Sequence, residues 1–311
     1  MDLDLLVLGD ANPDLVMRGD DVVPAFGQAE RLVDDAWLTV GGSGAIMACG
    51  AARLGLRVAF VGVVGDDLFG TYMREQLAAR GVDLSGLVVD PQRPTGVTVV
   101  LSRPDDRAIL TAPGTIGELR VSSIDPDLLA SARHMHVSSY FLQPGLAKDL
   151  PRVFADARGR GATTSVDPNW DPSGAWDGGL DGLLPWVDVL LPNEIEATRL
   201  AHTSDLEVAI ATLRGRGPLV VVKAGERGAI ASGPGERLRV PAVPVTTVDT
   251  TGAGDSFDAG FVAAMLDGES LERCLAIANA CGALSTRAAG GVEGQPTMQE
   301  ALGTVAAGSA A

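Results

Sequence analysis

The sequence predicts an α/β fold: a three-layer α/β/α sandwich with a mainly parallel central sheet and a small additional β-sheet. Short apolar runs alternate with segments of helical periodicity along most of the 311 residues, as expected when crossover helices join parallel strands. Two polar stretches, about residues 11–40 and 91–114, interrupt this alternation. We therefore expect one domain over residues 1–311, in which these two stretches are excursions from the main sheet.

The predicted strands are short apolar runs that end at glycine or polar residues. Such runs are typical of strands that are buried on both faces, as in a sheet with helices on each side. One further pair differs, because residues 97–101 alternate in polarity and residues 107–111 can return as the second strand of a hairpin. The buried runs cover residues 3–8, 58–64, 134–138, 162–167, 187–191 and 219–223.

Three segments have clear helical spacing. Residues 44–54 carry apolar side chains on one face and stop at Gly55, a residue that readily adopts the left-handed conformation that ends helices. Residues 68–80 follow the second predicted strand. Residues 256–266 repeat apolar side chains at helical intervals and follow the most informative motif of the chain.

The net charge of −16 excludes several classes of partner. Nucleic acids and anionic membranes bind positive surfaces, so neither is expected here. A nucleotide ligand remains compatible with this charge, because loop amides and Mg²⁺ neutralise phosphates locally.

Other features of composition predict a cytoplasmic protein without a membrane partner. No apolar run is long enough to cross a bilayer, and the first residues lack the basic region of a secretory signal. The three cysteines have no metal-ligand spacing and are predicted to be small core residues. His134 and His136 flank a predicted strand with no third ligand nearby, which favours packing over metal binding.

Residues 249–257 read Asp-Thr-Thr-Gly-Ala-Gly-Asp-Ser-Phe and predict an anion-binding turn. Gly252 and Gly254 permit a tight turn, and the free N–H groups of the helix that follows suit a phosphate. An acidic residue is unfavourable beside a phosphoryl anion unless it works as a general base, which is the role we assign to Asp255. A purely structural interpretation, a glycine turn with an aspartate at a helix start, explains the local residues equally well.

This motif resembles the C-terminal signature of the ribokinase-like (PfkB) carbohydrate kinase family, and further segments resemble the family in the same order along nearly all of the chain. The resemblance implies a ribokinase-like fold, in which the two polar stretches, about residues 11–40 and 91–114, form a β-sheet lid, and an ATP-dependent kinase activity. The supporting segments are Gly-Gly-Ser-Gly-Ala at 41–45, Val-Gly-Val-Val-Gly-Asp-Asp at 61–67, Asp-Pro-Asn at 167–169, Asn-Glu-Ile-Glu-Ala at 193–197 and Lys-Ala-Gly at 223–225.

By this resemblance, Asp255 is the base that takes the proton from the acceptor hydroxyl. The N–H groups of Gly252, Ala253 and Gly254 would form the anion hole for the transferred phosphoryl group. Loss of one such preorganised donor lowers the rate by about 10²–10³-fold.

The resemblance also implies cations. Asn193 and Glu196 match the Asn-x-x-Glu motif that holds the Mg²⁺ shell, here expected to act through water. Asp249 and Thr251 match residues that supply oxygens to K⁺ in many members, although a cap or turn role explains both residues nearly as well.

ATP is implied as the phosphoryl donor. Lys223 and Gly225 match the strand end over which the nucleotide lies, and Asn279 matches a residue beside the adenine or ribose. Gly228 lies in the same loop, and a role as a turn glycine is favoured for it.

On the acceptor side, Asp14 matches the aspartate that grips sugar hydroxyls, and Gly42 matches a glycine that lets the backbone approach. Ser43 and Asn169 belong to the same expected acceptor site. A carboxylate such as Asp14 accepts hydrogen bonds from two adjacent hydroxyls.

The chain departs from the family pattern at the acceptor side. Ile46 stands where ribokinase-type members have an asparagine, and Asp171 stands where several sugar-acid and fructose kinases have an arginine. Gln143 aligns weakly with a substrate-gripping glutamate. These departures predict an acceptor that is neither ribose in its usual pose nor an acidic sugar.

The predicted function is ATP-dependent phosphotransfer to a hydroxyl of a small-molecule acceptor, a neutral sugar. Two alternatives stay open: a nucleoside kinase, in which Ile46 faces the base, and a non-catalytic sugar or nucleotide sensor. A dinucleotide fingerprint would need glycine at Met47, and neither Lys148 nor Lys223 has P-loop spacing. The apolar side chains of residues 97–101 would offer the lid a homodimer face.

Overall fold

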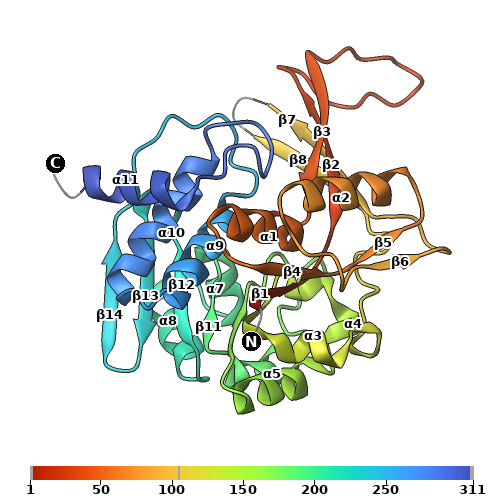
Figure 1. Cartoon of the computed structure of the whole chain (residues 1–311). Coiled ribbons are helices and arrows are strands. Elements are labelled where there is room, and N and C mark those ends of the chain that lie inside the picture. The colour runs from red at the N-terminus through yellow and green to blue at the C-terminus, as the bar shows by residue number, and fades with distance from the viewer. Residues whose placement is uncertain (1–2, 104–105, 309–311) are drawn as a thin grey trace.

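The computed structural model describes residues 3–103 and 106–308. Its main element is an eight-stranded sheet in the order β14-β13-β12-β11-β10-β9-β1-β4 (Figure 1). Pairing is parallel from β4 across to β12, whereas β13 and β14 are antiparallel, so the predicted mainly parallel sheet is confirmed. The strands are β1 (Leu3–Leu8), β4 (Val58–Val61), β9 (Ala132–Val137), β10 (Thr163–Val166), β11 (Val189–Leu190), β12 (Leu219–Lys223), β13 (Ala229–Gly233) and β14 (Glu236–Val240).

Helices cover both faces of this sheet and form two apolar cores (Figure 1). Alternate residues of β1 face opposite cores: Leu5 and Val7 contribute to one, and Leu6 and Leu8 to the other. One core includes α1 (Ser43–Arg53), α2 (Leu68–Ala79), α9 (Ala253–Leu266), α10 (Leu271–Ser285) and α11 (Met298–Gly308); the other includes α3 (Pro126–Ser131), α4 (Pro144–Ala147), α5 (Leu150–Gly159), α6 (Leu180–Leu183), α7 (Glu194–Leu200) and α8 (Leu206–Arg214).

A separate four-stranded sheet projects from the sandwich, in the order β3-β2-β7-β8 (Figure 1). It consists of β2 (Asn12–Arg18), β3 (Asp35–Gly41), β7 (Val97–Ser102) and β8 (Arg107–Ala112). These strands come from the two polar stretches that interrupt the sequence pattern, and the predicted hairpin is confirmed as the antiparallel pair β7–β8. We refer to this unit below as the small sheet.

The chain departs from the predicted elements at Gly62. Residues 58–64 were expected to form one strand, but β4 ends at Val61, and β5 (Val63–Gly65) pairs with β6 (Val88–Asp90) in a two-stranded sheet of its own. A Cβ at position 62 would lie 2.6 Å from the Phe60 ring and 2.8 Å from the Gly9 carbonyl oxygen. The close approach explains why glycine occupies this bend.

Two other boundaries differ from the prediction. Helix α9 begins at Ala253 rather than at residue 256, so Asp255 belongs to its first turn. The hairpin β13–β14 was not anticipated, since its second strand, Glu236–Val240, carries charged residues and is largely exposed. An edge strand of this kind has a weak apolar signal.

The three cysteines are buried and unpaired, as expected of core residues. Within residues 3–103 and 106–308, no helix combines the length and the hydropathy required to span a membrane.

His134 and His136 lie side by side in β9 and are fully buried. The His134 ring contacts the hydroxyls of Thr163 and Ser165 at 2.7 Å, and His136 Nδ1 contacts the same Ser165 hydroxyl at 2.7 Å. Burial lowers the pKa of His134 to about 3 and that of His136 to about 4. Both are neutral packing residues, and in the described part of the chain no three His, Cys, Asp or Glu side chains form a metal cluster.

We predict that neither imidazole titrates between pH 8 and about pH 5. Because the unfolded chain takes up protons near the ordinary value of 6.5 and the folded chain does not, these two residues destabilise the fold as pH falls below that value. Histidine NMR, with His134→Asn and His136→Asn used for assignment, measures the two midpoints. A midpoint above about 6 for either ring would contradict the prediction.

Candidate active site

Buried acidic side chains gather where the parallel strands end, the edge at which open α/β sheets bind ligands. All of them are nearly completely buried, although each can carry a negative charge. They come from the ends of β1 and β10, from the first turn of α7 and from the first two turns of α9: Asp10, Asp167, Glu196, Asp255 and Asp258.

Lys223, the last residue of β12, is clamped between two of these carboxylates. Its Nζ lies 3.0 Å from Asp167 Oδ2 and 3.2 Å from Asp258 Oδ2, and the three side chains are 13%, 7% and 1% exposed. Burial alone would lower the pKa of Lys223, but the two carboxylates outweigh it and hold that pKa well above its usual value. The side chain expected near the nucleotide is thus engaged inside the protein.

The glycine motif forms the turn into α9, as its sequence predicts. Gly252 is the N-cap residue with φ 72°, and a Cβ there would lie 2.7 Å from the Gly291 carbonyl oxygen, so only glycine fits. The Ala253 N–H donates to the Thr250 carbonyl oxygen at 3.3 Å. Within the described residues, the N–H groups of Gly252 and Gly254 have no protein acceptor, which leaves them available to an anion.

Asp255 lies in the first turn of α9, directly after these amides. Burial raises its pKa well above the usual value, and the nearby charges of Asp167 and Asp10 raise it further. The Lys223 ammonium and a hydrogen bond from Ser43 act in the opposite direction. A buried carboxylate of raised pKa is typical of a general base.

The expected sugar-gripping residue, Asp14, is buried in β2 of the small sheet. Burial and the charge of Asp10 raise its pKa to about 7, and Asn12 Nδ2 donates to its Oδ1 at 3.3 Å. Gly41 borders the carboxylate, since a Cβ there would lie 1.9 Å from Asp14 Oδ1, and Gly42 (φ 80°) borders the Asp10 carbonyl oxygen. The glycine pair therefore makes room for the Asp10 and Asp14 segment.

Asn169 and Ser43 are brought together beside this cluster. Asn169 Nδ2 donates to Ser43 Oγ at 3.1 Å and to Ser139 Oγ at 3.0 Å, and its N–H donates to Asp167 Oδ1 at 2.9 Å. Ser139, which also contacts Asp10, was missed from the sequence because a lone serine after a strand gives no signal.

Two residues expected at the acceptor site, Ile46 and Gln143, are buried. Ile46 is buried, with its side chain packed against Gly252 and Gly291 beneath the glycine turn. Gln143 is fully buried and donates to the Ile116 carbonyl oxygen at 3.0 Å. Ile46 therefore borders the glycine turn, and an acceptor role for Ile46 and Gln143 stays a prediction.

Asp171 makes its hydrogen bonds within its own loop. Its carboxylate accepts from the Ser173 N–H at 2.8 Å and the Trp176 N–H at 2.6 Å, which closes the loop that follows Asn169. These hydrogen bonds hold the pKa of Asp171 below its usual value despite the opposing effect of burial. The Asp171 charge therefore has hydrogen-bond donors within its own loop.

Asn193 and Glu196 form a reciprocal cap at the start of α7. Asn193 Oδ1 accepts from the Glu196 N–H at 2.9 Å, and Glu196 Oε2 accepts from the Asn193 N–H at 2.8 Å. Burial and the charge of Asp167 raise the pKa of Glu196 to about 7. A buried carboxylate whose charge is destabilised in this way fits a water-mediated Mg²⁺ site, because the cation would offset that charge.

Asp249 stabilises the glycine turn. Its Oδ1 accepts from the Thr251 N–H at 2.9 Å and the Thr251 hydroxyl at 2.8 Å, and its Oδ2 accepts from the Gly290 N–H at 2.9 Å. Asp249 and Thr251 therefore have the cap or turn role that was the alternative to K⁺ binding. Arg107 of β8 donates to the Thr251 hydroxyl at 3.0 Å, a link between the small sheet and the turn that the sequence did not indicate.

The residues expected near the nucleotide form turns or donate hydrogen bonds to the main chain in this structure. Gly225 (φ 56°) opens a single 3₁₀ turn, and Gly228 (φ 85°) passes so close to Val240 that a Cβ would lie 2.0 Å from its carbonyl oxygen. Asn279 Nδ2 donates to the carbonyl oxygens of Val240 and Pro241 at 3.1 Å each. Gly228 is thus a turn glycine.

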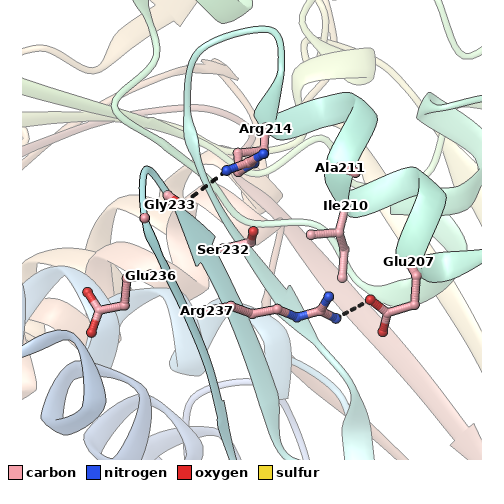
Figure 2. A pocket seen from close by; sticks show the side chains of 9 residues that line it. Glu207, Ile210, Ala211, Arg214, Ser232, Gly233, Glu236 and Arg237 are labelled. Atoms are coloured by element: carbon pink, nitrogen blue, oxygen red, sulfur yellow. Dashed lines mark hydrogen bonds and ion pairs between the residues drawn. The ribbon is translucent and has the colours of Figure 1, made fainter.

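A surface hollow of about 310 Å³ lies apart from this cluster, between α8 and the hairpin β13–β14 (Figure 2). Its two arginines are already engaged: Arg214 with the Gly233 carbonyl oxygen and Arg237 with Glu207. The hollow shares no residue with the carboxylate cluster, and we do not assign it to the reaction.

Comparisons with known proteins agree with this geometry. Residues 2–298 match the pfkB family carbohydrate kinases. A fructokinase of Salmonella typhimurium is 32% identical over 93% of this chain and 98% of its own length, and a nucleoside kinase of Methanothermobacter thermautotrophicus is 33% identical over 77% and 76%. An E. coli protein described as a ribokinase II, solved with ATP and Mg²⁺, matches with a TM-score of 0.86 at 28% identity over 98% of this chain and 99% of that one. The chain therefore belongs to the pfkB family of carbohydrate kinases and has the ribokinase-like fold.

Proposed function

We propose that the protein transfers the γ-phosphoryl group of ATP to a hydroxyl of a neutral sugar, with Asp255 as the general base. The observation that carries the proposal is the position of Asp255 in the first turn of α9, directly after the amides of Gly252 and Gly254. A proton acceptor and an anion site are thereby adjacent, as phosphoryl transfer to a hydroxyl requires.

In this mechanism the acceptor hydroxyl gives its proton to an Asp255 oxygen as it attacks phosphorus. The raised pKa of Asp255 strengthens it as a base once it is ionised. The Gly252 and Gly254 amides bind the oxygens of the transferred group in the orientation that the turn already fixes. Ser43, held by Asn169, orients the carboxylate.

Asn193 and Glu196 would hold Mg²⁺ through water, and the bound ion would neutralise phosphate charge. Lys223 and Gly225 would support the nucleotide through their backbone, with Asn279 and Gly228 shaping the adjoining chain. We also propose K⁺ beside Asp249 and Thr251. Activity that is equal in sodium and potassium buffers would rule out the K⁺ site.

The acceptor would lie between Asp14 and Asp255. Asp14 and Asn12 offer neighbouring oxygen and nitrogen atoms that suit adjacent sugar hydroxyls. A nucleoside is the second candidate, favoured by the similarity to a nucleoside kinase. A screen of ADP release over neutral sugars, sugar alcohols, phosphosugars and nucleosides separates the two.

Asp255→Asn should reduce ATP-dependent phosphorylation of the acceptor by about 10³-fold or more, because the amide cannot accept the proton. Coupled ADP release measures the rate, and circular dichroism checks the fold. Asp20→Asn, which removes one exposed charge in the connection between β2 and β3, is the matched control. Turnover by Asp255→Asn within tenfold of the control would contradict the assignment of the base.

The same substitution should stabilise the protein in the absence of ligands. Because the folded-state pKa of Asp255 is raised above its ordinary value of 3.8, the folded chain holds this proton more tightly, and stability is lost as pH rises from about 4 through the folded-state value. The asparagine side chain in Asp255→Asn does not ionise, so the variant does not lose stability in this way as pH rises. Thermal unfolding at pH 7 should show a Tm at least about 2 °C above that of Asp20→Asn, and an equal or lower Tm would refute it.

We propose that the protein forms a homodimer through the small sheet. The contact would use exposed side chains of β8 in place of the predicted side chains of residues 97–101. Val99 and Leu101 are partly buried, whereas Ile109 and Leu110 of β8 are 56% and 61% exposed. Leu110→Lys should convert a dimer to a monomer in sedimentation velocity, and Leu302→Lys on α11 should not. A monomeric wild-type protein would end this proposal.

A cytoplasmic location is proposed from the need for ATP and from the three unpaired cysteines. Recovery of the intact protein in a secreted fraction would contradict it.

A further inference from the structure

The Lys223 ammonium lies next to the proposed base as well as between its two carboxylate partners. A Cβ at Gly254 would lie 3.6 Å from Lys223 Nζ, so the ammonium borders the residue that directly precedes Asp255. Asp258 follows Asp255 by three residues on α9 and therefore shares its face of the helix. The cation is thus placed where its charge acts on the reacting carboxylate.

The charged groups that face Asp255 are mostly acidic. Asp10 acts on it from the end of β1, Asp167 from the end of β10 and Asp258 from α9 itself. Among these facing groups in the described chain, Lys223 is the one cation; Glu196 of α7 faces Lys223 in turn. Without the ammonium, Asp255 would have to ionise among carboxylates alone.

Stability is a poor explanation for such a cluster. Desolvation of buried ions commonly offsets their attraction, and well-packed apolar residues often serve equally well in their place. A buried cation retained beside a base has a chemical use, because it lowers the free energy of the ionised base.

We propose, on the basis of the function proposed above, that Lys223 is a positioning residue for catalysis: its buried ammonium acts through Asp167, Asp258 and the Gly254 segment as the counter-ion that keeps Asp255 in its proton-accepting form. It touches neither the acceptor nor the transferred phosphoryl group in this assignment.

The test compares Lys223→Met, Asp258→Asn and the double variant with the wild-type protein. If Lys223 acts by its charge, Lys223→Met moves the acidic limb of the kcat/KM profile upward by about one pH unit or more, a roughly tenfold loss at pH values below the wild-type limb that is recovered at higher pH. The KM for ATP stays within about threefold, since nucleotide contacts are unchanged. Asp258→Asn moves the limb downward or leaves it in place.

The double variant addresses folding. Lys223→Met alone strands two buried carboxylates, whereas Lys223→Met with Asp258→Asn removes one of them and is the better-folded background. Its acidic limb should lie above that of Asp258→Asn by about one pH unit. An upward shift of the acidic limb by a similar amount in Asp258→Asn and in Lys223→Met would overturn the proposal. If the Lys223–Asp258 contact only held the structure together, loss of either partner would have the same effect. An unshifted double variant would also overturn it.

A second readout does not need turnover. In protein labelled at the aspartate carboxyl carbon with ¹³C, the Asp255 resonance is assigned by its loss in Asp255→Asn. Its titration midpoint should rise in Lys223→Met and in the double variant relative to their parents, and an unchanged midpoint would refute the inference. If the wild-type protein transfers no phosphoryl group to any compound of the acceptor screen, the proposed function is refuted. The Asp255 titration midpoint would still test whether the Lys223 ammonium acts on Asp255.

Discussion

The arrangement of the candidate site depends on the ion cluster of Lys223 with Asp167 and Asp258. Each partner comes from a different element: β12, the end of β10 and the first turns of α9. The cluster therefore fixes the start of α9 against the carboxyl edge of the sheet. From Asp167 the network continues to Asn169 and Ser43, so the glycine turn and the start of α1 share one polar framework.

This framework concentrates negative charge in a buried place, which opposes folding unless cations or protons compensate it. The raised pKa values of Asp14, Glu196 and Asp255 express the same constraint at three positions. Such crowding is typical of sites where function is retained at the expense of stability. Glu196 faces this cluster and Asp14 lies on the small sheet; in the proposed function, Mg²⁺ would offset the charge of Glu196 and a sugar hydroxyl would bind Asp14.

The sequence alone was sufficient for the parts of the molecule that depend on local pattern. Apolar runs predicted the parallel sheet, and two polar interruptions predicted the small sheet. The glycine turn was recognisable because Gly252 must adopt a positive φ. Side-chain direction was not predictable: Ile46 and Gln143 turn into the core, and Asp171 closes its own loop. Pairings between distant segments, such as Lys223 with Asp258 or Arg107 with Thr251, exist only once the chain has folded.

In the proposed reaction, this buried acid and its glycine turn transfer a phosphoryl group from ATP to an acceptor hydroxyl. The most direct measurement is ³¹P NMR of the protein with ATP, Mg²⁺ and an acceptor identified by the screen. We expect a phosphomonoester resonance that grows in step with ADP, because Asp255 activates the acceptor hydroxyl rather than water. Accumulation of ADP with inorganic phosphate and no phosphomonoester would contradict it.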